Sequence, residues 1–437
     1  MTAYQSVHDR PGKLALMMAA IPGVDCVLNQ VNTAFGISVS GMSLLQLVRG
    51  ALILIFFFLC ARVLMANPTR LKQVPLAVPT GMLLIGAAIS KELCETGTVV
   101  VVGIVPYGQM LYWLLMWAVV VLLCSKPPDA RVILIGIAAG AVMTAASVFL
   151  GLAVGTGNFY RTDAVQASAG WFETAKMITG VLTTGGVVLL FLGWRSRSWY
   201  FPVFAWLVFS ACIVTYARAG TVALIVSLMW LFVWVSIWGR QDSGLAKRFA
   251  ILGALLCIVG TASISPTQLF ARWNDVEGGA TAGSGRATFW KIAVDAFAED
   301  HLFDQVAGQG YSSMSAVLYD RYGDDIKHTH NDALDMMLVG GIAGCMWLLL
   351  FIADLVSMVL RCPMSSPARA AAVAILLIYL CHSQLTGQIW GTDSMTYYTL
   401  SLSSIAVLQS AAHRERVHGP QGCAAKSGRM IYTDLPA

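Results

Sequence analysis

The sequence predicts an all-α polytopic membrane protein with about twelve transmembrane helices and one small helical cap outside the bilayer. Three observations support this class. Hydrophobic residues make up 57% of the 437 residues and charged residues only 12%, whereas soluble domains carry about 25% charged residues. Apolar runs long enough to cross a bilayer, which needs about 17–25 residues, recur along most of the chain. One polar segment, residues 267–333, interrupts them.

The apolar runs give the predicted spans, the first of which is the weakest because it contains Pro22 and Asp25. Arg10 and Lys13 precede this run as in a signal peptide, but no small-residue cleavage site follows, so we expect an uncleaved first span. The twelve predicted spans are 14–31, 42–66, 75–92, 99–124, 131–155, 176–194, 199–217, 219–238, 248–266, 334–360, 368–387 and 393–411.

The basic residues predict which side each connection faces. If the N terminus is cytoplasmic and the spans alternate, cytoplasmic segments hold 18 of the 28 Lys and Arg residues, and short outer segments hold five. This sorting agrees with the positive-inside rule. We therefore expect nine spans within 1–266, three within 334–411, and a loose cytoplasmic tail at 412–437, with both termini in the cytoplasm.

The segment 267–333 forms the one large extramembrane element. Apolar residues recur at helical spacing over 286–299 and predict an amphipathic helix, and a second short helix is expected before Tyr322. The segment holds ten acidic and five basic residues, so a diffuse basic patch cannot attract an anion there. Any bound diphosphate would need a few positioned arginines, whose planar fork matches phosphate oxygens. A smaller outer loop is expected at 156–175.

The segment His328-Thr329-His330-Asn331-Asp332 is the leading candidate for chemistry, because it ends the polar segment where a long apolar run begins. Asn331 and Asp332 suit the N-cap of the following helix, whose N-terminus favours a nearby anion. The imidazole of His330 titrates near neutral pH and could act as a general base beside that anion. The alternative is a polar residue that anchors the helix at the interface. His328 is expected to be exposed or supporting.

Outer arginines are the candidate anion ligands. Arg218 lies between two apolar runs, where an ionised guanidinium costs at least about 2.5–3.5 kcal/mol, so it should face a polar cavity or an anion; the alternative is snorkelling to headgroups. Arg286 opens the predicted 286–299 helix, where a cation is disfavoured unless it has another partner; the alternative is an exposed charge. Arg161 and Arg272 are weaker candidates that could be ordinary surface charges.

The sequence motifs of several other classes of functional site are absent. The pair Asp324-Asp325 without a D-x-D arrangement does not indicate a Mg²⁺ site, and none of the ten cysteines has CxxC spacing, so we expect apolar packing and no metal. There is no Walker loop, no dinucleotide-binding glycine motif after a strand, no HExxH and no G-x-S-x-G, and we expect no cofactor. The net charge of +5 does not indicate nucleic acid.

The motifs together resemble the O-antigen ligase and polymerase superfamily. His330-Asn331, then nine residues, then the glycines of 341–344, looks like its His-Asn…G-x-x-G signature. Gly285-Arg286 with Trp290 resembles its G-R-x-x-x-W segment. Three further matches are weaker alone, namely the G-x-G turn at 308–310, the S-R-[GA] element at 216–219, and Arg161, which lacks the usual following Pro-Asn pair. The motifs cover about residues 215–345.

This resemblance implies a metal-independent, inverting glycosyltransferase of the inner membrane with a GT-C-like fold and a periplasmic active site. Members take a glycan from undecaprenyl diphosphate; ligases join it to lipid A–core and polymerases to another repeat unit. It implies that Arg218 and Arg286 hold the diphosphate and that His330 deprotonates the acceptor hydroxyl. The twelve-span plan favours the ligase, with the polymerase as alternative. A transporter of the lipid-linked glycan is a further alternative, but its usual paired broken helices and internal repeats are not visible.

Overall fold

The computed structural model describes most of the chain and is an all-α membrane protein with two short β-hairpins. The described residues are 10–36, 38–39, 42–96, 101–154, 159–162, 165–168, 175–215, 217–238, 286–322 and 328–427. Within them, nine helices are long and apolar enough to cross a membrane. These are α2 (Lys13–Phe35), α3 (Leu44–Ala66), α4 (Ala77–Thr96), α5 (Val101–Leu123), α6 (Pro127–Val154), α7 (Ala175–Ser196), α9 (Arg218–Trp238), α15 (Asp332–Leu360) and α16 (Pro367–Leu385).

Eleven of the twelve predicted spans appear as helices. The remaining one, 248–266, lies outside the described residues. Two of the eleven differ from ordinary spans. Helix α8 (Tyr200–Val214) has only 15 residues, and α17 (Thr392–Ser427) is rich in Ser and Thr. Helix α17 extends to Ser427, so the described part of the tail predicted to be loose is helical.

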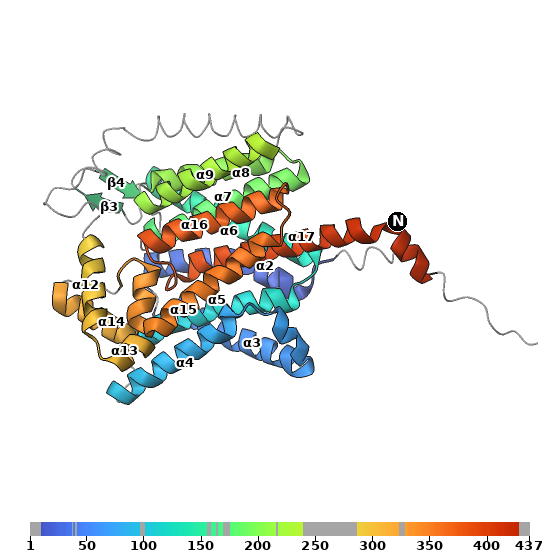
Figure 1. Cartoon of the computed structure of the whole chain (residues 1–437). Coiled ribbons are helices and arrows are strands. Elements are labelled where there is room, and N and C mark those ends of the chain that lie inside the picture. Colours follow the sequence, from blue (N-terminus) through green and yellow to red (C-terminus); the bar gives the residue numbers. More distant parts are fainter. Residues whose placement is uncertain are drawn as a thin grey trace, which may run out of the picture.

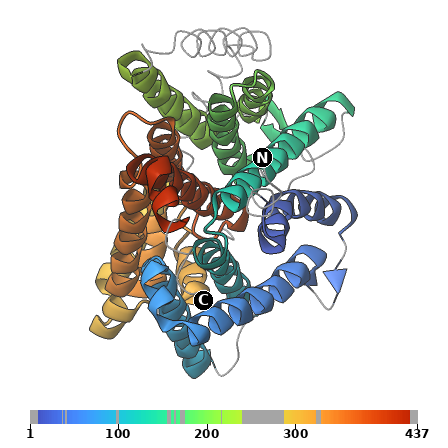
Figure 2. The same cartoon turned by 90° about the vertical axis from the view of Figure 1, so that its right-hand side faces the viewer.

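Helix α17 runs through the middle of the bundle, with α5, α6, α7, α15 and α16 around it (Figure 2). Its hydroxyl side chains, such as those of Thr399 and Ser403, are buried against these neighbours and not in lipid. The indole nitrogen of Trp117 donates to Ser403 Oγ at 2.8 Å. Surrounding protein therefore satisfies polar groups that would be costly in hydrocarbon, which explains why this central helix is less apolar than the others.

The described elements outside the bundle lie mainly at one end of it. The cap contains the predicted helix at 286–299 as α12 (Arg286–Glu299), the second predicted helix as α14 (Tyr311–Tyr322), and an unpredicted one, α13 (Leu302–Ala307). Strand β3 (Phe159–Thr162) pairs antiparallel with β4 (Val165–Ser168) at the same end (Figure 1), and α17 leaves the bundle at the other end. The remaining elements are β1 (Ser38–Val39), β2 (Met42–Ser43) and the 3₁₀ helix η1 (Pro68–Gln73).

The cap is seated on a break in α15. Gly341 has non-helical backbone angles (φ 61°, ψ −147°) inside the helix. In an unbroken helix the carbonyls of Leu338 and Val339 would accept from residues 342 and 343. They accept instead from Gln309 N at 2.8 Å and Gly310 N at 3.1 Å, in the turn between α13 and α14. The kink thus makes room for the cap and supplies the acceptors that hold it.

The end of α4 provides a second anchor for the cap. The carboxylate of Glu92, which is buried, accepts from the backbone nitrogen of Ser312 at 3.1 Å and from its hydroxyl at 3.2 Å, at the start of α14. Tyr107 of α5 donates to the same carboxylate at 2.9 Å and accepts from Tyr311 N at 2.8 Å. Lys91 pairs with Asp304 of α13. Free amide groups at the start of α14 are thereby satisfied from inside the bundle.

Candidate active site

The turn at 328–331 leads directly into α15, as the sequence predicts. Asn331 is the N-cap, and its side-chain oxygen accepts from Ala333 N at 2.9 Å and Leu334 N at 3.3 Å. This arrangement satisfies the first free amides of the helix. It also changes one expectation, because amides that already donate to Asn331 are not available to an anion. A diphosphate at this turn would therefore depend on arginines.

His330 occupies a constrained backbone position in this turn. Its φ is +60°, and in the described part of the chain only Arg197 is another non-glycine residue with positive φ. The residue is half-buried. The backbone nitrogen of His330 donates to Nδ1 of His328 at 3.2 Å, and the two rings lie 4.2 Å apart, edge to face. His328 therefore supports the turn.

The end of α16 and the loop that follows it brace the same turn. The side-chain nitrogen of Asn331 donates to Gln384 Oε1 at 3.1 Å. The fully buried carboxylate of Asp332 accepts from the backbone nitrogens of Gln388 and Ile389, the latter at 3.0 Å. Gly387 has a φ of +64° and passes so close that a Cβ there would lie 3.4 Å from His328 Nδ1. These partners were not predicted: Gln384 and Gly387 fall within the predicted span 368–387, and only Gln388 and Ile389 lie in the short interruption after it.

An aromatic group joins this loop to the cap. The ring of Trp390, in the α16–α17 loop, lies 5.0 Å from the ring of Tyr311 in α14 and 6.3 Å from that of Tyr107 in α5, both edge to face. Such contacts contribute beyond the area that they bury. The cap, the bundle and the loop that braces His330 therefore meet in one packed cluster.

Helix α12 brings the predicted Arg286 segment to the His330 turn. The indole nitrogen of Trp290 donates to the carbonyl of Thr329 at 3.2 Å, next to His330 in the chain. Residues four apart on a helix share a face and are separated by about 6 Å along its axis. Arg286 opens α12, so its backbone lies one helical turn from a direct contact with the turn that carries His330.

Helix α9 brings Arg218 to the same end of the bundle. Trp230 donates to the carbonyl of Ala370 at 3.0 Å, and Trp234 donates to that of Met364 at 3.1 Å, so α9 and α16 run antiparallel. Arg218 lies about 18 Å before Trp230 along α9, and the end of α16 lies about 22 Å beyond Ala370. Arg218, which is half-buried, therefore lies near the level of Gln384 and hence of Asn331.

The two weaker arginine candidates are placed less closely. Arg161 is in β3, at the end of the bundle that also carries α12 and α14 (Figure 1). Arg272 lies outside the described residues, as do Asp324 and Asp325. Among the residues described, no three His, Cys, Asp or Glu side chains gather in a way that could hold a metal ion. The metal-free mechanism stays a prediction.

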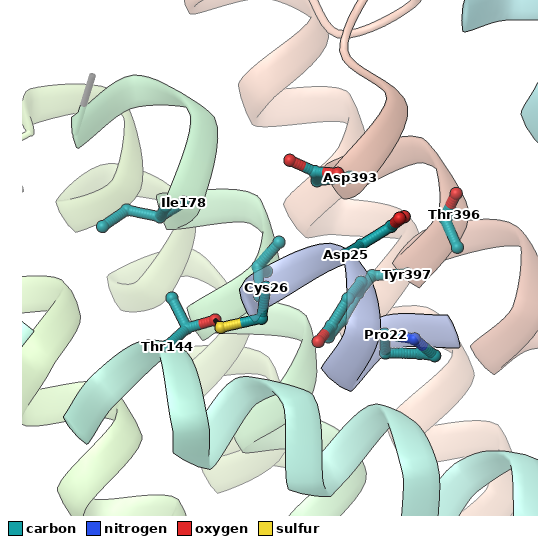
Figure 3. Close-up of a pocket in the computed structure, with 9 residues that line it drawn as sticks. Pro22, Asp25, Cys26, Thr144, Ile178, Asp393, Thr396 and Tyr397 are labelled. Carbon is teal, nitrogen blue, oxygen red and sulfur yellow. Dashed lines mark hydrogen bonds between the residues drawn. The ribbon is translucent and has the colours of Figure 1, made fainter. Parts of the chain in front are cut away.

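A buried charge network includes Asp393, in the first turn of α17. Arg49 of α3 forms ion pairs with Asp393 and, at 3.3 Å, with Asp25 of α2, the residue that weakened the first predicted span. Asn29 donates to Asp393 at 3.1 Å. Figure 3 shows Asp25 and Asp393 among the residues that line a small pocket, together with Thr144 and Tyr397. The network pins the start of α17, and with it the loop that braces His330.

A comparison with family models supports the assignment that the motifs suggest. A model described as O-antigen ligase matches residues 203–352, which include α9, the described cap and the His330 turn. No curated protein matches the chain. The matched stretch contains the motifs at 216–219, 308–310, 330–331 and 341–344 in the expected order. Over residues 203–352, the chain is therefore similar to the O-antigen ligase family.

Proposed function

We propose that this protein is an O-antigen ligase, which transfers a glycan from undecaprenyl diphosphate to lipid A–core on the periplasmic side of the inner membrane. The observation that carries the proposal is the turn of His330, which lies where α12, α15 and the end of α16 meet. The family match covers this turn. The membrane orientation, with both termini in the cytoplasm, rests on the distribution of Lys and Arg.

The reaction is a single displacement. His330 takes the proton of the acceptor hydroxyl while its oxygen forms a bond to the anomeric carbon of the donor glycan, and the bond from that carbon to the diphosphate oxygen breaks. Attack from the face opposite the leaving group inverts the anomeric configuration. Electrons of the broken bond remain on the diphosphate, so its growing negative charge needs stabilisation.

Arg218 and Arg286 are the proposed ligands of the diphosphate, with Arg161 as a third candidate. Bidentate guanidinium contacts suit phosphate oxygens, and they act without a metal. The need for them follows from the capped start of α15, whose first amides already donate to Asn331. Asn331 and His328 hold the turn and are not assigned a step in the reaction.

The test is transfer by purified protein with both lipid-linked substrates in detergent. His330→Ala should lower turnover by about 10²–10⁴-fold while donor binding persists. Arg218→Ala and Arg286→Ala should weaken donor binding by roughly 10- to 100-fold, since each removes a charge-assisted contact worth about 1.5–3 kcal/mol. Arg321→Ala is the matched control, because that cap arginine pairs with Glu299 at the surface. Near-normal turnover of the His330 variant would falsify the base assignment.

The acceptor distinguishes the ligase from its alternatives. Transfer to lipid A–core supports the ligase, whereas transfer to another repeat unit would make the protein a polymerase of the same superfamily. Deletion of the gene gives an independent comparison: polymerised glycan left on the lipid carrier fits the ligase, and glycan stopped at one repeat unit fits the polymerase. Transfer in detergent, where no gradient exists, is incompatible with a pure transporter.

A further inference from the structure

The backbone at His330 adopts a conformation that needs support. A positive φ places the Cβ of an L residue close to its own backbone, so non-glycine residues rarely adopt it. Such positions persist when the surrounding structure determines them, and they cluster at functional sites. The contacts that fix His328 and Thr329, the two residues before His330, therefore control where the His330 imidazole lies.

Thr329 is the residue through which the turn is held. It is completely buried, and it makes contacts in three directions. Its backbone nitrogen and its hydroxyl both donate to Oδ1 of Asp335, at 2.7 and 2.6 Å. Its hydroxyl oxygen accepts from Asn331 N at 3.3 Å, and its carbonyl accepts from Trp290. The peptide units on both sides of His330 are thereby tied to Thr329 or to its partners.

Asp335 is the group that anchors Thr329. It lies in the first turn of α15 and is completely buried. Its own backbone nitrogen donates to the carbonyl of Asn331 at 2.9 Å, so its position is set by the helix. Its second carboxylate oxygen lies 3.5 Å from Nδ1 of His328. A helix N-terminus favours a carboxylate, which helps to offset the cost of burying this one.

We propose that Asp335, acting through Thr329, is a positioning residue that holds His330 in the orientation needed to deprotonate the acceptor. This rests on the proposed role of His330 as the base. Asp335 accepts two hydrogen bonds from Thr329, the residue before His330, and belongs to the first turn of α15, so it transmits the helix geometry to the turn. Small displacements of a reacting group are costly, because catalysis depends on a near-attack geometry.

The test uses the full-length protein and substitutions that separate position from charge. Thr329→Val keeps the shape of the side chain and removes the hydroxyl donor, whereas Thr329→Ser keeps that donor. Thr329→Val and Asp335→Ala should lower kcat by on the order of 10- to 100-fold, as expected for a misplaced base, with little change in KM. Thr329→Ser should restore most of the turnover. Asp335→Asn, which can still accept a hydrogen bond, should be intermediate.

Asp129→Asn is the matched control. Asp129 is also buried in the first turn of a membrane helix, α6, and also accepts from a backbone nitrogen, that of Gly12 at 2.7 Å. It lies where α2 begins, away from the His330 turn. If loss of any such carboxylate impaired the enzyme through folding alone, this variant would lose kcat as Asp335→Asn does, and that result would overturn the inference.

Two readouts separate positioning from stability and from the proposed function itself. Turnover is measured well below the Tm of each variant; a lower Tm with unchanged kcat would contradict a positioning role. The pH profile of kcat for Thr329→Val should fall in height without shifting along the pH axis, because no charge has changed, and a displaced profile would argue against positioning.

If His330→Ala stays active, the proposed function fails. If it is inactive while Thr329→Val and Asp335→Ala turn over normally, only this inference fails. Should Thr329→Val not fold, Asp335→Asn provides the same comparison.

Discussion

Replacing Gly341 with alanine should release the cap from α15. The φ of +61° at Gly341 is one that L side chains rarely adopt. A Cβ built there would lie 2.5 Å from the carbonyl oxygen of Gln305 and 2.7 Å from the backbone nitrogen of Gly308. Both atoms belong to the backbone of the cap, so neither can rotate away as the end of a side chain could.

The estimated cost of a side chain at position 341 is at least as large as the hydrogen-bond energy that holds the turn at 308–310 on α15. An unfavourable backbone conformation of this kind costs about 1–3 kcal/mol, and inserting a methyl group into a closely packed site typically costs about 1–3 kcal/mol more. The sum, roughly 2–6 kcal/mol, compares with about 1 kcal/mol net for each of the two hydrogen bonds that Gln309 and Gly310 donate to α15. The turn at 308–310 should therefore leave its position on the helix.

Hydrogen exchange of the purified protein measures this release, together with Tm and glycan transfer. Gly341→Ala should speed exchange over 302–322 and lower transfer. Gly340→Ala is the control, since its Cβ would first meet the end of the Leu84 side chain at 3.2 Å, which can move. Equal protection of 302–322 in the two variants would refute the view that the kink at Gly341 seats the cap.

Three further predictions concern the buried charges and the cap. Arg49→Ala should lower the free energy of unfolding by about 3–5 kcal/mol, because it leaves two carboxylates buried without their cation. Adding Asp25→Asn should recover part of the loss in Tm, and no recovery would contradict the pairing. Glu92→Ala should expose α14 to faster hydrogen exchange, whereas Glu92→Gln, which can still accept from Ser312, should do so less; identical exchange in both variants would count against the anchor. Burial raises the pKa of the Asp300 carboxyl, so its contribution to stability is present at low pH and is lost as the pH rises through that raised value. Asp300→Asn should therefore keep or raise the Tm at neutral pH, and a lower Tm there would show that the charged form is the stabilising one.

A metal-free mechanism predicts that excess EDTA leaves transfer intact, because arginines and not a divalent ion carry the diphosphate. The transfer assay is run with wild-type protein before and after chelation. A strict requirement for a divalent ion, restored by adding it back, would contradict this mechanism.

Local patterns in the sequence were sufficient to predict much of the helical framework. The helix predicted over 286–299 has those bounds in the structure, because apolar spacing reports directly on which face of a helix is buried. Asn331 was expected to cap α15 and does so, since capping involves residues only two or three positions apart. Both signals are contained within one or two helical turns of the chain.

Long-range partners had no such signal. Asp25 counted against the first predicted span, yet its charge is compensated by Arg49, on another helix. The brace of Asn331 by Gln384 joins segments 53 residues apart. The Ser and Thr residues of α17 suggest a poor membrane span when its composition is considered alone, and they make sense only once five helices surround it. Each of these features depends on tertiary contacts that residue spacing does not encode.

The spacing of the His-Asn…G-x-x-G motif has a mechanical explanation here. Asn331 starts α15, and Gly341 interrupts it ten residues later, about 15 Å along the helix axis. That separation lets the start of α15 hold the turn of His330 while the break accepts the turn at 308–310. The cap therefore contacts α15 at two levels, through Trp290 beside His330 and through Gly308 at the break. An insertion of one residue between Asn331 and Gly341 would rotate the break by about 100° relative to the start of the helix, so the cap could not make both contacts. The motif thus couples the candidate base to the cap through helix geometry, and its glycines need no part in the chemistry.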